Sequence, residues 1–260
     1  MNNTIHKGDC LELMSAIPDG SVDMILCDLP YGTTACKWDV IIPFEPLWEQ
    51  YKRIIKSNGA IVLMASQPFT SALVMSNPKM FKYEWIWKKS KPSGMFNANN
   101  QPMNNHESVL VFYQSPTIYN KILEPRECNE ASKNRLKYLM TGFNGSKTYG
   151  NTTKQKKKYD AELRNPTTVK EFRQTPNPLR KHPTEKPILM LEYFIKTYTN
   201  EGETVLDNCA GSGTTAIACL NTNRNYILME KEQNYFEMIT KRIAKWHSER
   251  EPQGLFKQAI

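Results

Sequence analysis

The sequence lacks any apolar run long enough to cross a membrane. A transmembrane helix needs roughly 18 or more consecutive apolar residues, and none of its 260 residues stand in such a run. The first ten residues, MNNTIHKGDC, have no apolar core of the kind found in signal peptides. We therefore expect a cytoplasmic protein with no membrane partner.

The sequence also lacks a cysteine framework. Six cysteines are scattered along it, at positions 10, 27, 36, 128, 209 and 219. None forms a Cys-x-x-Cys pair or pairs with a histidine at metal-ligand spacing. We expect reduced thiols, with no disulfide and no bound metal.

Charge is unevenly distributed. The net charge is +8, and residues 121–181 alone hold 15 Lys or Arg against six Asp or Glu. The rest of the chain holds 19 basic and 20 acidic residues. A concentrated excess of this kind indicates a polyanionic partner, although a solvated insert would show the same composition.

Apolar patterns outside this segment alternate between strands and helices. Residues 22–28 and 60–65 read as strands, and 43–59 as a helix that ends at Asn58-Gly59. After the basic segment, a second block of helix, strand, glycine turn, helix and strand covers 185–230. The alternation predicts an α/β fold with a doubly wound, largely parallel sheet. We divide it into a first half (1–114), a basic insert (115–181) and a second half (182–260).

The richest motif is VLDNCAGSGTTAIACL, residues 205–220. A strand ends at Asp207, Gly211 and Gly213 form a tight turn, and a helix follows. Glycines at a helix N-terminus let a ligand approach backbone N–H groups. Glu230 ends the next strand, 23 residues after Asp207, where an acid suits the hydroxyls of a ribose. The lysine of a P-loop is missing, which argues against phosphate cradling.

A second motif, CDLPYG at 27–32, also follows a strand. It places a carboxylate, Asp28, next to a rigid proline and an aromatic ring. Since ligands lie over the carboxyl ends of parallel strands, Asp28 and the glycine turn should face one crevice. On its own the motif would be a turn with Asp as a local cap.

Three motifs together resemble a known family. DLPY at 28–31, HPTEKP at 182–187 and DNCAGSGTT at 207–215 are similar to those of S-adenosylmethionine-dependent DNA amino-methyltransferases of the β-group, which methylate adenine N6 or cytosine N4. The resemblance covers nearly the whole chain. It implies a Rossmann-like, mostly parallel sheet of seven strands with one reversed strand, and a target-recognition region between the two halves.

The resemblance also implies residue roles. The catalytic motif is Asp28, Leu29, Pro30 and Tyr31. The S-adenosylmethionine site comprises Asp9, Thr184, Lys186, Asp207, Ala210, Gly211, Gly213 and Glu230. Asp9 would meet the adenine of the cofactor, although Asp9 with Glu12 three residues later is also a helix-capping pattern.

Double-stranded DNA is the expected partner, with a homodimer and a cognate restriction nuclease left open. Contacts with DNA phosphates are expected from Lys and Arg of the basic insert, namely Lys154, Lys156, Lys157, Lys158, Arg164, Arg173, Arg180 and Lys181. Phe96 is a further candidate for contact with DNA or with the target base.

The chemistry of the motif follows from the weakness of an exocyclic amine as a nucleophile. Asp28 and the carbonyl of Leu29 can each accept one N–H and turn the nitrogen lone pair toward a methyl donor, while Pro30 fixes the backbone. Tyr31 offers its ring to a flipped base. Family members that act on cytosine N4 more often carry serine at position 28, so Asp28 favours adenine N6. Cytosine N4, an RNA substrate and a catalytically silent nucleic-acid-binding protein are the alternatives.

Overall fold

The computed structural model describes residues 3–125, 162–174, 176 and 185–250. Within them the chain divides into a main unit, which holds residues up to 120 and from 168 onward, and a small unit at 121–167. In the small unit, β6 (Glu124–Pro125) pairs with β7 (Leu163–Arg164) in an antiparallel ladder. No helix of the described residues is long and apolar enough to cross a membrane.

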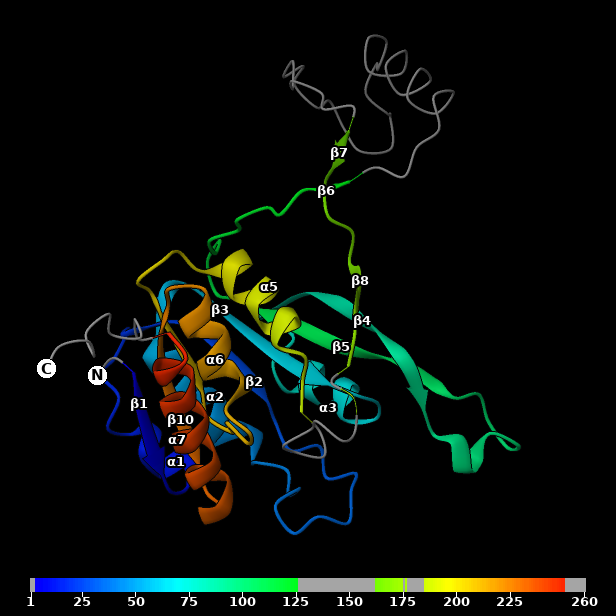
Figure 1. Cartoon of the computed structure of the whole chain (residues 1–260), viewed down its shortest axis with the longest axis horizontal. Coiled ribbons are helices and arrows are strands. Elements are labelled where there is room, and N and C mark those ends of the chain that lie inside the picture. The colour runs from blue at the N-terminus through cyan, green and yellow to red at the C-terminus, as the bar shows by residue number, and fades with distance from the viewer. Residues whose placement is uncertain (1–2, 126–161, 175, 177–184, 251–260) are drawn as a thin grey trace, which may run out of the picture. The chain divides into compact units, whose positions relative to one another are not determined.

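Eight strands of the main unit form one sheet in the order β1-β10-β9-β2-β3-β5-β4-β8 (Figure 1). In chain order they are β1 (Thr4–Lys7), β2 (Val22–Asp28), β3 (Ile55–Ala65), β4 (Phe81–Ser93), β5 (Asn104–Phe112), β8 (Val169–Phe172), β9 (Thr204–Asp207) and β10 (Asn225–Glu230). Only β5 is reversed, because its pairings with β3 and β4 are the only antiparallel ones in this sheet. The predicted doubly wound, mostly parallel α/β fold is confirmed.

The expected number of seven strands is wrong by one. The additional strand is β8, which pairs in parallel with Ile86–Lys89 of β4. Its four residues, VKEF, are too few and too polar to show a periodic pattern. The basic composition around it therefore hid it in the predicted insert.

Helices cover both faces of the sheet. One face packs against α5 (Ile188–Tyr198), α6 (Thr214–Asn221) and α7 (Gln233–Ser248), and the other against α1 (Cys10–Met14), α2 (Phe44–Ile54) and α3 (Phe69–Ser76). Side chains alternate along β2, so Met24 and Leu26 join the α5 core while Ile25 and Cys27 join the α2 core.

The helix predicted over 43–59 ends earlier than expected. Helix α2 stops at Ile54, and β3 begins at the next residue. Gly59 is needed for close packing within the sheet instead of for a helix end, since a Cβ there would lie 2.8 Å from the carbonyl oxygen of Asp23. The prediction failed because Ile55 pairs with Val22, a contact that helical periodicity does not reveal.

Candidate active site

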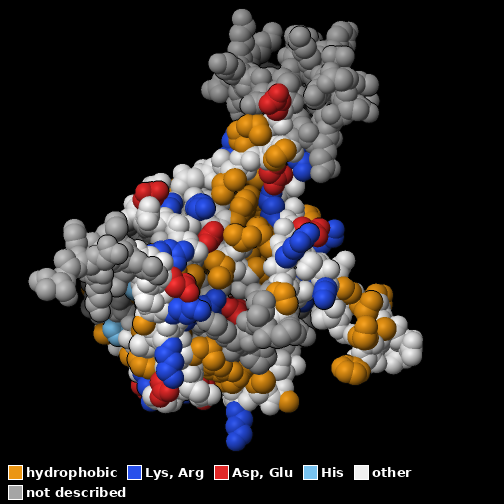
Figure 2. All heavy atoms as spheres, in the orientation of Figure 1, with side chains coloured by type: hydrophobic (Ala, Val, Ile, Leu, Met, Phe, Trp, Pro, Cys, Tyr) orange, Lys and Arg blue, Asp and Glu red, His pale blue; other side chains and the backbone are white. Residues whose placement is uncertain are grey.

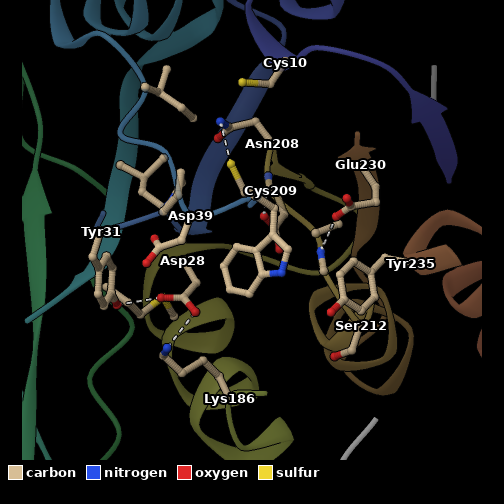
Figure 3. Close-up of a pocket in the computed structure, with 18 of the residues that line it drawn as sticks. Cys10, Asp28, Tyr31, Asp39, Lys186, Asn208, Cys209, Ser212, Glu230 and Tyr235 are labelled. Atoms are coloured by element: carbon tan, nitrogen blue, oxygen red, sulfur yellow. Dashed lines mark hydrogen bonds and ion pairs between the residues drawn. The ribbon is translucent and has the colours of Figure 1, made fainter. Parts of the chain in front are cut away.

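A cavity of about 720 Å³ lies at the carboxyl ends of the parallel strands (Figure 3). Asp28 ends β2, Asp207 ends β9 and Glu230 ends β10, and all three line it. Asp9, just after β1, lines it too. Two predicted motifs about 180 residues apart therefore share one cavity of a size that suits a small-molecule ligand.

Asp28 lies at the end of this cavity nearest α5. Side chains alternate along β2, so Asp28 lies on the same face as Met24 and Leu26, which is the face that α5 covers. Tyr31 donates its hydroxyl to Asp28 Oδ1 at 2.6 Å, and Lys186 Nζ lies 2.6 Å from Asp28 Oδ2. Both carboxylate oxygens thus have a donor and keep a further lone pair for another N–H.

Lys186 connects Asp28 to a second carboxylate. Its Nζ lies 3.4 Å from Glu107 Oε2, and Glu107 Oε1 lies 2.7 Å from Lys89 Nζ. Burial would lower the pKa of Lys186, yet the charges of Asp28 and Glu107 raise it above the usual value. Burial would likewise raise the pKa of Glu107, but Lys186 and Lys89 hold it below its usual range. Lys186 and Glu107 therefore stay ionised at neutral pH. We call Asp28, Lys186, Glu107 and Lys89 the charge chain.

Tyr31 is held by several contacts. Its ring stacks on Phe69 with centroids 5.2 Å apart and planes 24° apart. The Lys186 ammonium lies 5.7 Å from the ring centroid. Burial first, and then the charges of Asp28 and Glu107, raise the pKa of Tyr31 well above its usual value, so the phenol remains a donor to Asp28. Leu29, between the two, is buried.

Asp39 organises the loop that follows Tyr31. Its carboxylate accepts three backbone N–H groups, from Gly32 at 2.8 Å, Thr33 at 2.9 Å and Thr34 at 2.7 Å. Burial would raise the pKa of Asp39, but these bonds and the Thr34 side chain lower it. The loop then lines the cavity with Asp39, Val40 and Ile41. Sequence reasoning missed Asp39, because three consecutive amides converging on one side chain leave no pattern.

The glycine turn forms the opposite end of the cavity. Gly213 has a φ of 73° and starts α6. A Cβ on it would lie 2.9 Å from Ile239 of α7, so only glycine fits. Asp207 is buried, and its oxygens accept from Cys209 N at 3.1 Å and Thr215 Oγ1 at 2.5 Å. Burial outweighs these bonds and raises the pKa of Asp207 to about 6.

Glu230 supports the same turn. Its Oε2 accepts from Gly211 N at 2.8 Å, and its Oε1 accepts from Glu232 N at 2.8 Å. Burial raises the pKa of Glu230, against the effect of the backbone donors. Asp9 is the N-cap of α1, accepting from Leu11 N at 3.0 Å, and it also lies 3.3 Å from Lys231 Nζ. The predicted capping role of Asp9 is confirmed.

Arg242 of α7 connects the glycine turn to the segment that carries Lys186. It lies 2.9 Å from Glu185 Oε1 and donates to the carbonyl of Ser212 at 3.0 Å. Thr214 Oγ1 donates to Glu185 at 3.3 Å. The residue before Lys186 is therefore anchored on the glycine turn, while Lys186 itself points to Asp28 (Figure 3).

Three thiols lie together at the cavity: Cys10 and Cys209 line it, and Cys27 is hydrogen-bonded to Cys209. Hydrogen bonding between Cys10 and Cys209 is the main cause that raises the pKa of Cys10, and burial raises the pKa of Cys27 to about 12. All five cysteines of the described residues are free thiols. Their positions at 10, 27 and 209 gave no sign of this clustering.

The structure describes only some of the other predicted site residues. Ala210 is buried beside the turn and lines the cavity. Arg164 lies 3.4 Å from Glu124 within the small unit, and Arg173 is exposed just after β8. The remaining predicted positions lie outside the described residues: Thr184 of the cofactor site, and Lys154, Lys156, Lys157, Lys158, Arg180 and Lys181 of the DNA contacts.

Comparison with known proteins gives consistent results. The sequence model of the N6/N4 methylase family, described as DNA methylase, matches residues 22–241. The chain is 27% identical to the type II methyltransferase M.HinfI of Haemophilus influenzae, over 93% of this chain and 68% of that protein. It is also 27% identical to the type II methyltransferase M2.MboI of Moraxella bovis, over 93% and 87% respectively.

Solved structures show the same fold. The M1.HpyAVI complex with SAM aligns with a TM-score of 0.62 and 24% identity, covering 92% of this chain and 98% of that one. The cytosine-N4-specific PvuII DNA methyltransferase aligns with a TM-score of 0.64 and 13% identity, covering 93% and 86%.

Proposed function

Because the chain belongs to the family of S-adenosylmethionine-dependent DNA amino-methyltransferases, we propose that it methylates the N6 amine of adenine at a specific site in double-stranded DNA. The observation that supports this most directly is the shared cavity. It brings the DLPY motif at the end of β2 together with the glycine turn after β9 and with Glu230 at the end of β10.

Asp9, Asp207, Gly211 and Glu230 form the end of the cavity that would hold the cofactor. Glu230 offers carboxylate oxygens at the edge of the turn, which suits the two hydroxyls of a ribose. Asp207 is a buried carboxylate that accepts hydrogen bonds from two neutral donors, Cys209 N and Thr215 Oγ1, and an ammonium group would compensate its charge. When bound, S-adenosylmethionine supplies an electrophilic methyl group on a sulfonium.

The target amine binds at the other end. One N–H donates to the free lone pair of an Asp28 oxygen and the second to the carbonyl of Leu29. These two acceptors favour a tetrahedral nitrogen whose lone pair points into the cavity, which is catalysis by positioning and electrostatics. After transfer, the proton of the methylated, cationic amine leaves to Asp28 or water.

Lys186 takes part at the target end in this mechanism. Its ammonium neutralises part of the charge of Asp28 and lies near the Tyr31 ring, where the flipped base would stack. A base placed there must share this space with Lys186, whose long side chain can shift within the cavity. The cofactor contact that the family resemblance implied for Lys186 stays a prediction, since Lys186 lines the shared cavity.

Adenine is favoured over cytosine by Asp28, since serine is more common at that position in enzymes acting on cytosine N4. The relatives M.HinfI and M2.MboI are type II methyltransferases, which supports action at a defined sequence. A cognate restriction nuclease and a homodimer stay predictions from the sequence.

Nucleoside analysis of DNA tests the proposal directly. Plasmid DNA incubated with the protein and S-adenosylmethionine should yield N6-methyladenine, and the Asp28→Ala variant should yield none above background. N4-methylcytosine would replace the adenine assignment, and absence of both with intact cofactor binding would favour a silent nucleic-acid-binding protein. Sequencing that detects modified bases would then give the recognition site.

A further inference from the structure

The outer part of the β4–β5 hairpin extends away from the sheet (Figure 1). We call residues 88–106 the hairpin arm. Every residue from 90 to 106 is exposed, whereas Trp85 and Trp87, earlier on β4, and Val109 and Val111, later on β5, are buried in the core. The arm contributes nothing to the hydrophobic core, so its sequence is free to serve another purpose.

The arm has an unusual composition for an exposed hairpin. It contains no Asp or Glu, three lysines (Lys88, Lys89 and Lys91), and six amide side chains, Asn97, Asn99, Asn100, Gln101, Asn104 and Asn105. Lys91 is exposed, while Lys88 and Lys89 pair with Glu171 and Glu107. The exposed Lys91 and the amide groups give the outer part of the arm a surface complementary to a nucleic acid.

Large apolar side chains gather at the tip of the arm. Phe96 is 104% exposed, Met95 78% and Met103 43%. Figure 2 shows them as an apolar group on the arm. Gly94, with a φ of 92°, begins the short 3-10 turn that presents Met95 and Phe96. Full exposure of a phenylalanine ring has no benefit for the isolated chain, which indicates an external surface that covers it.

The base of the arm is continuous with the active-site cavity. Lys89, Ser93 and Glu107 line the same cavity as Asp28. Ser93 also donates to the carbonyl of Asn104 at 3.2 Å, which ties the two strands where the arm leaves the cavity. A duplex that delivers a base to Asp28 therefore passes beside the arm.

From these observations we propose that the hairpin arm inserts into double-stranded DNA next to the flipped nucleotide. A two-stranded β-ribbon fits the major groove, and Asn or Gln can read the edge of adenine. Apolar side chains such as Phe and Met insert between bases, and a flipped base leaves its neighbours without a stacking partner. In this arrangement Phe96 stacks on the bases next to the vacated position. The proposal rests on the proposed function, and it adds a recognition surface outside the basic insert.

The experiment compares Phe96→Ala with a matched control, Met75→Ala. Met75 is also 71% exposed but lies on α3, away from the arm. Affinity for a mixed-sequence duplex and methyl transfer into plasmid DNA are measured for both. Phe96→Ala should weaken duplex binding about tenfold, as expected when a stacked aromatic ring is lost, and lower kcat/KM for DNA at least as much. Cofactor affinity and melting temperature should match the wild type, and Met75→Ala should behave as the wild type throughout.

A second variant, Lys91→Gln, tests the electrostatic part. It should reduce the slope of log affinity against log salt by about one. Unchanged duplex affinity in both Phe96→Ala and Lys91→Gln would overturn the proposal and leave the proposed function standing. If Phe96→Ala weakens DNA binding while the wild type transfers no methyl group, the proposed role of the hairpin arm would be supported and the proposed function overturned. A Phe96→Ala protein that changes from dimer to monomer with unaltered DNA affinity would assign the arm to a second copy of the chain instead.

Discussion

Lys186 Nζ lies 2.6 Å from Asp28 Oδ2, although 158 positions separate the two residues in the chain. The segment before α5 thus places a cation on the carboxylate that ends β2. Because Glu107 and Lys89 continue the alternation of charge, the orientation of Asp28 depends on three residues beyond its own motif. Substitution of any of these three residues should alter how Asp28 orients the target amine.

Asp28→Ala should lower single-turnover methyl transfer by at least about a hundredfold, because one preorganised acceptor of the target amine is removed. Cofactor affinity, measured by calorimetry, should stay close to that of the wild type. Asp19→Ala is the control, since this exposed carboxylate pairs only with Arg53 away from the cavity. Full turnover in Asp28→Ala would reject the mechanism.

Lys186→Met should destabilise the protein by up to about 3–5 kcal/mol, because it leaves the partly buried carboxylates of Asp28 and Glu107 without their shared cation. Urea unfolding at pH 7 measures this. The lowered pKa of Glu107 means that its ion pairs stabilise the protein above about pH 4.5 and lose this effect on acidification. The difference in the free energy of unfolding between wild type and variant should therefore shrink as the pH falls below about 4.5. The double variant Lys186→Met/Glu107→Gln should be more stable than Lys186→Met alone, because it removes one of the carboxylates left without the cation. Additive changes in the free energy of unfolding for the two substitutions would argue against coupling through the charge chain.

Asp207→Asn should stabilise the cofactor-free protein at neutral pH. The pKa of Asp207 is about 6 in the folded protein against 3.8 ordinarily, so its ionisation disfavours the folded state as the pH rises from about 4 to about 6. The difference corresponds to at most about 3 kcal/mol. The stability advantage of the variant over the wild type should grow across this pH range. With saturating S-adenosylmethionine only the wild type should gain further, and an advantage that does not vary with pH would contradict the assignment.

Glu230→Ala should raise the Kd of S-adenosylmethionine, since the ribose hydroxyls would lose a charged acceptor and Gly211 N–H would lose its partner. Calorimetry measures the effect. Glu237→Ala, an exposed carboxylate on α7, is the matched control. Equal affinities for the two variants would reject the predicted position of the ribose.

Changing Lys154, Lys156, Lys157 and Lys158 together to Gln should flatten the slope of log affinity for DNA against log salt by a few units, because each phosphate contact releases counterions. Affinity should fall by a similar factor for every sequence, while cofactor affinity stays constant. An unchanged slope would indicate that this run is a solvated loop. The phosphate contacts would then be expected from Arg164, Arg173, Arg180 and Lys181.

The sequence was sufficient to predict the doubly wound sheet and the common cavity, because β2 and β9 are apolar strands that each end in an acid. It was not sufficient for β1, whose four residues TIHK form a strand only by pairing with Ile227–Glu230. Helix α3 was missed as well, since its eight residues follow the strand without a polar face that periodicity could detect.

The charge chain could not have been predicted for a different reason. Glu107 lies in the polar first half of β5, where the sequence gives no sign of a site residue. Its role depends on β5 running antiparallel to β3, which brings Ser108 opposite Ala65 and Glu107 toward the cavity. Such cross-sheet neighbours follow from strand order, and strand order is a property of the folded chain.

Strand order also has a consequence for how the protein is made. In the finished sheet, β2 lies between β3 and β9, and Met24 pairs with Val205. A chain emerging from the ribosome offers β2 its β3 neighbour early, but β9 and the glycine turn follow only after residue 200. A nascent chain of about 200 residues would thus hold Asp28 and the hairpin arm but lack Asp207, Gly211 and Glu230 of the cofactor end. Synthesis through β10, and not exposure of the catalytic motif, is then the step that completes the cavity.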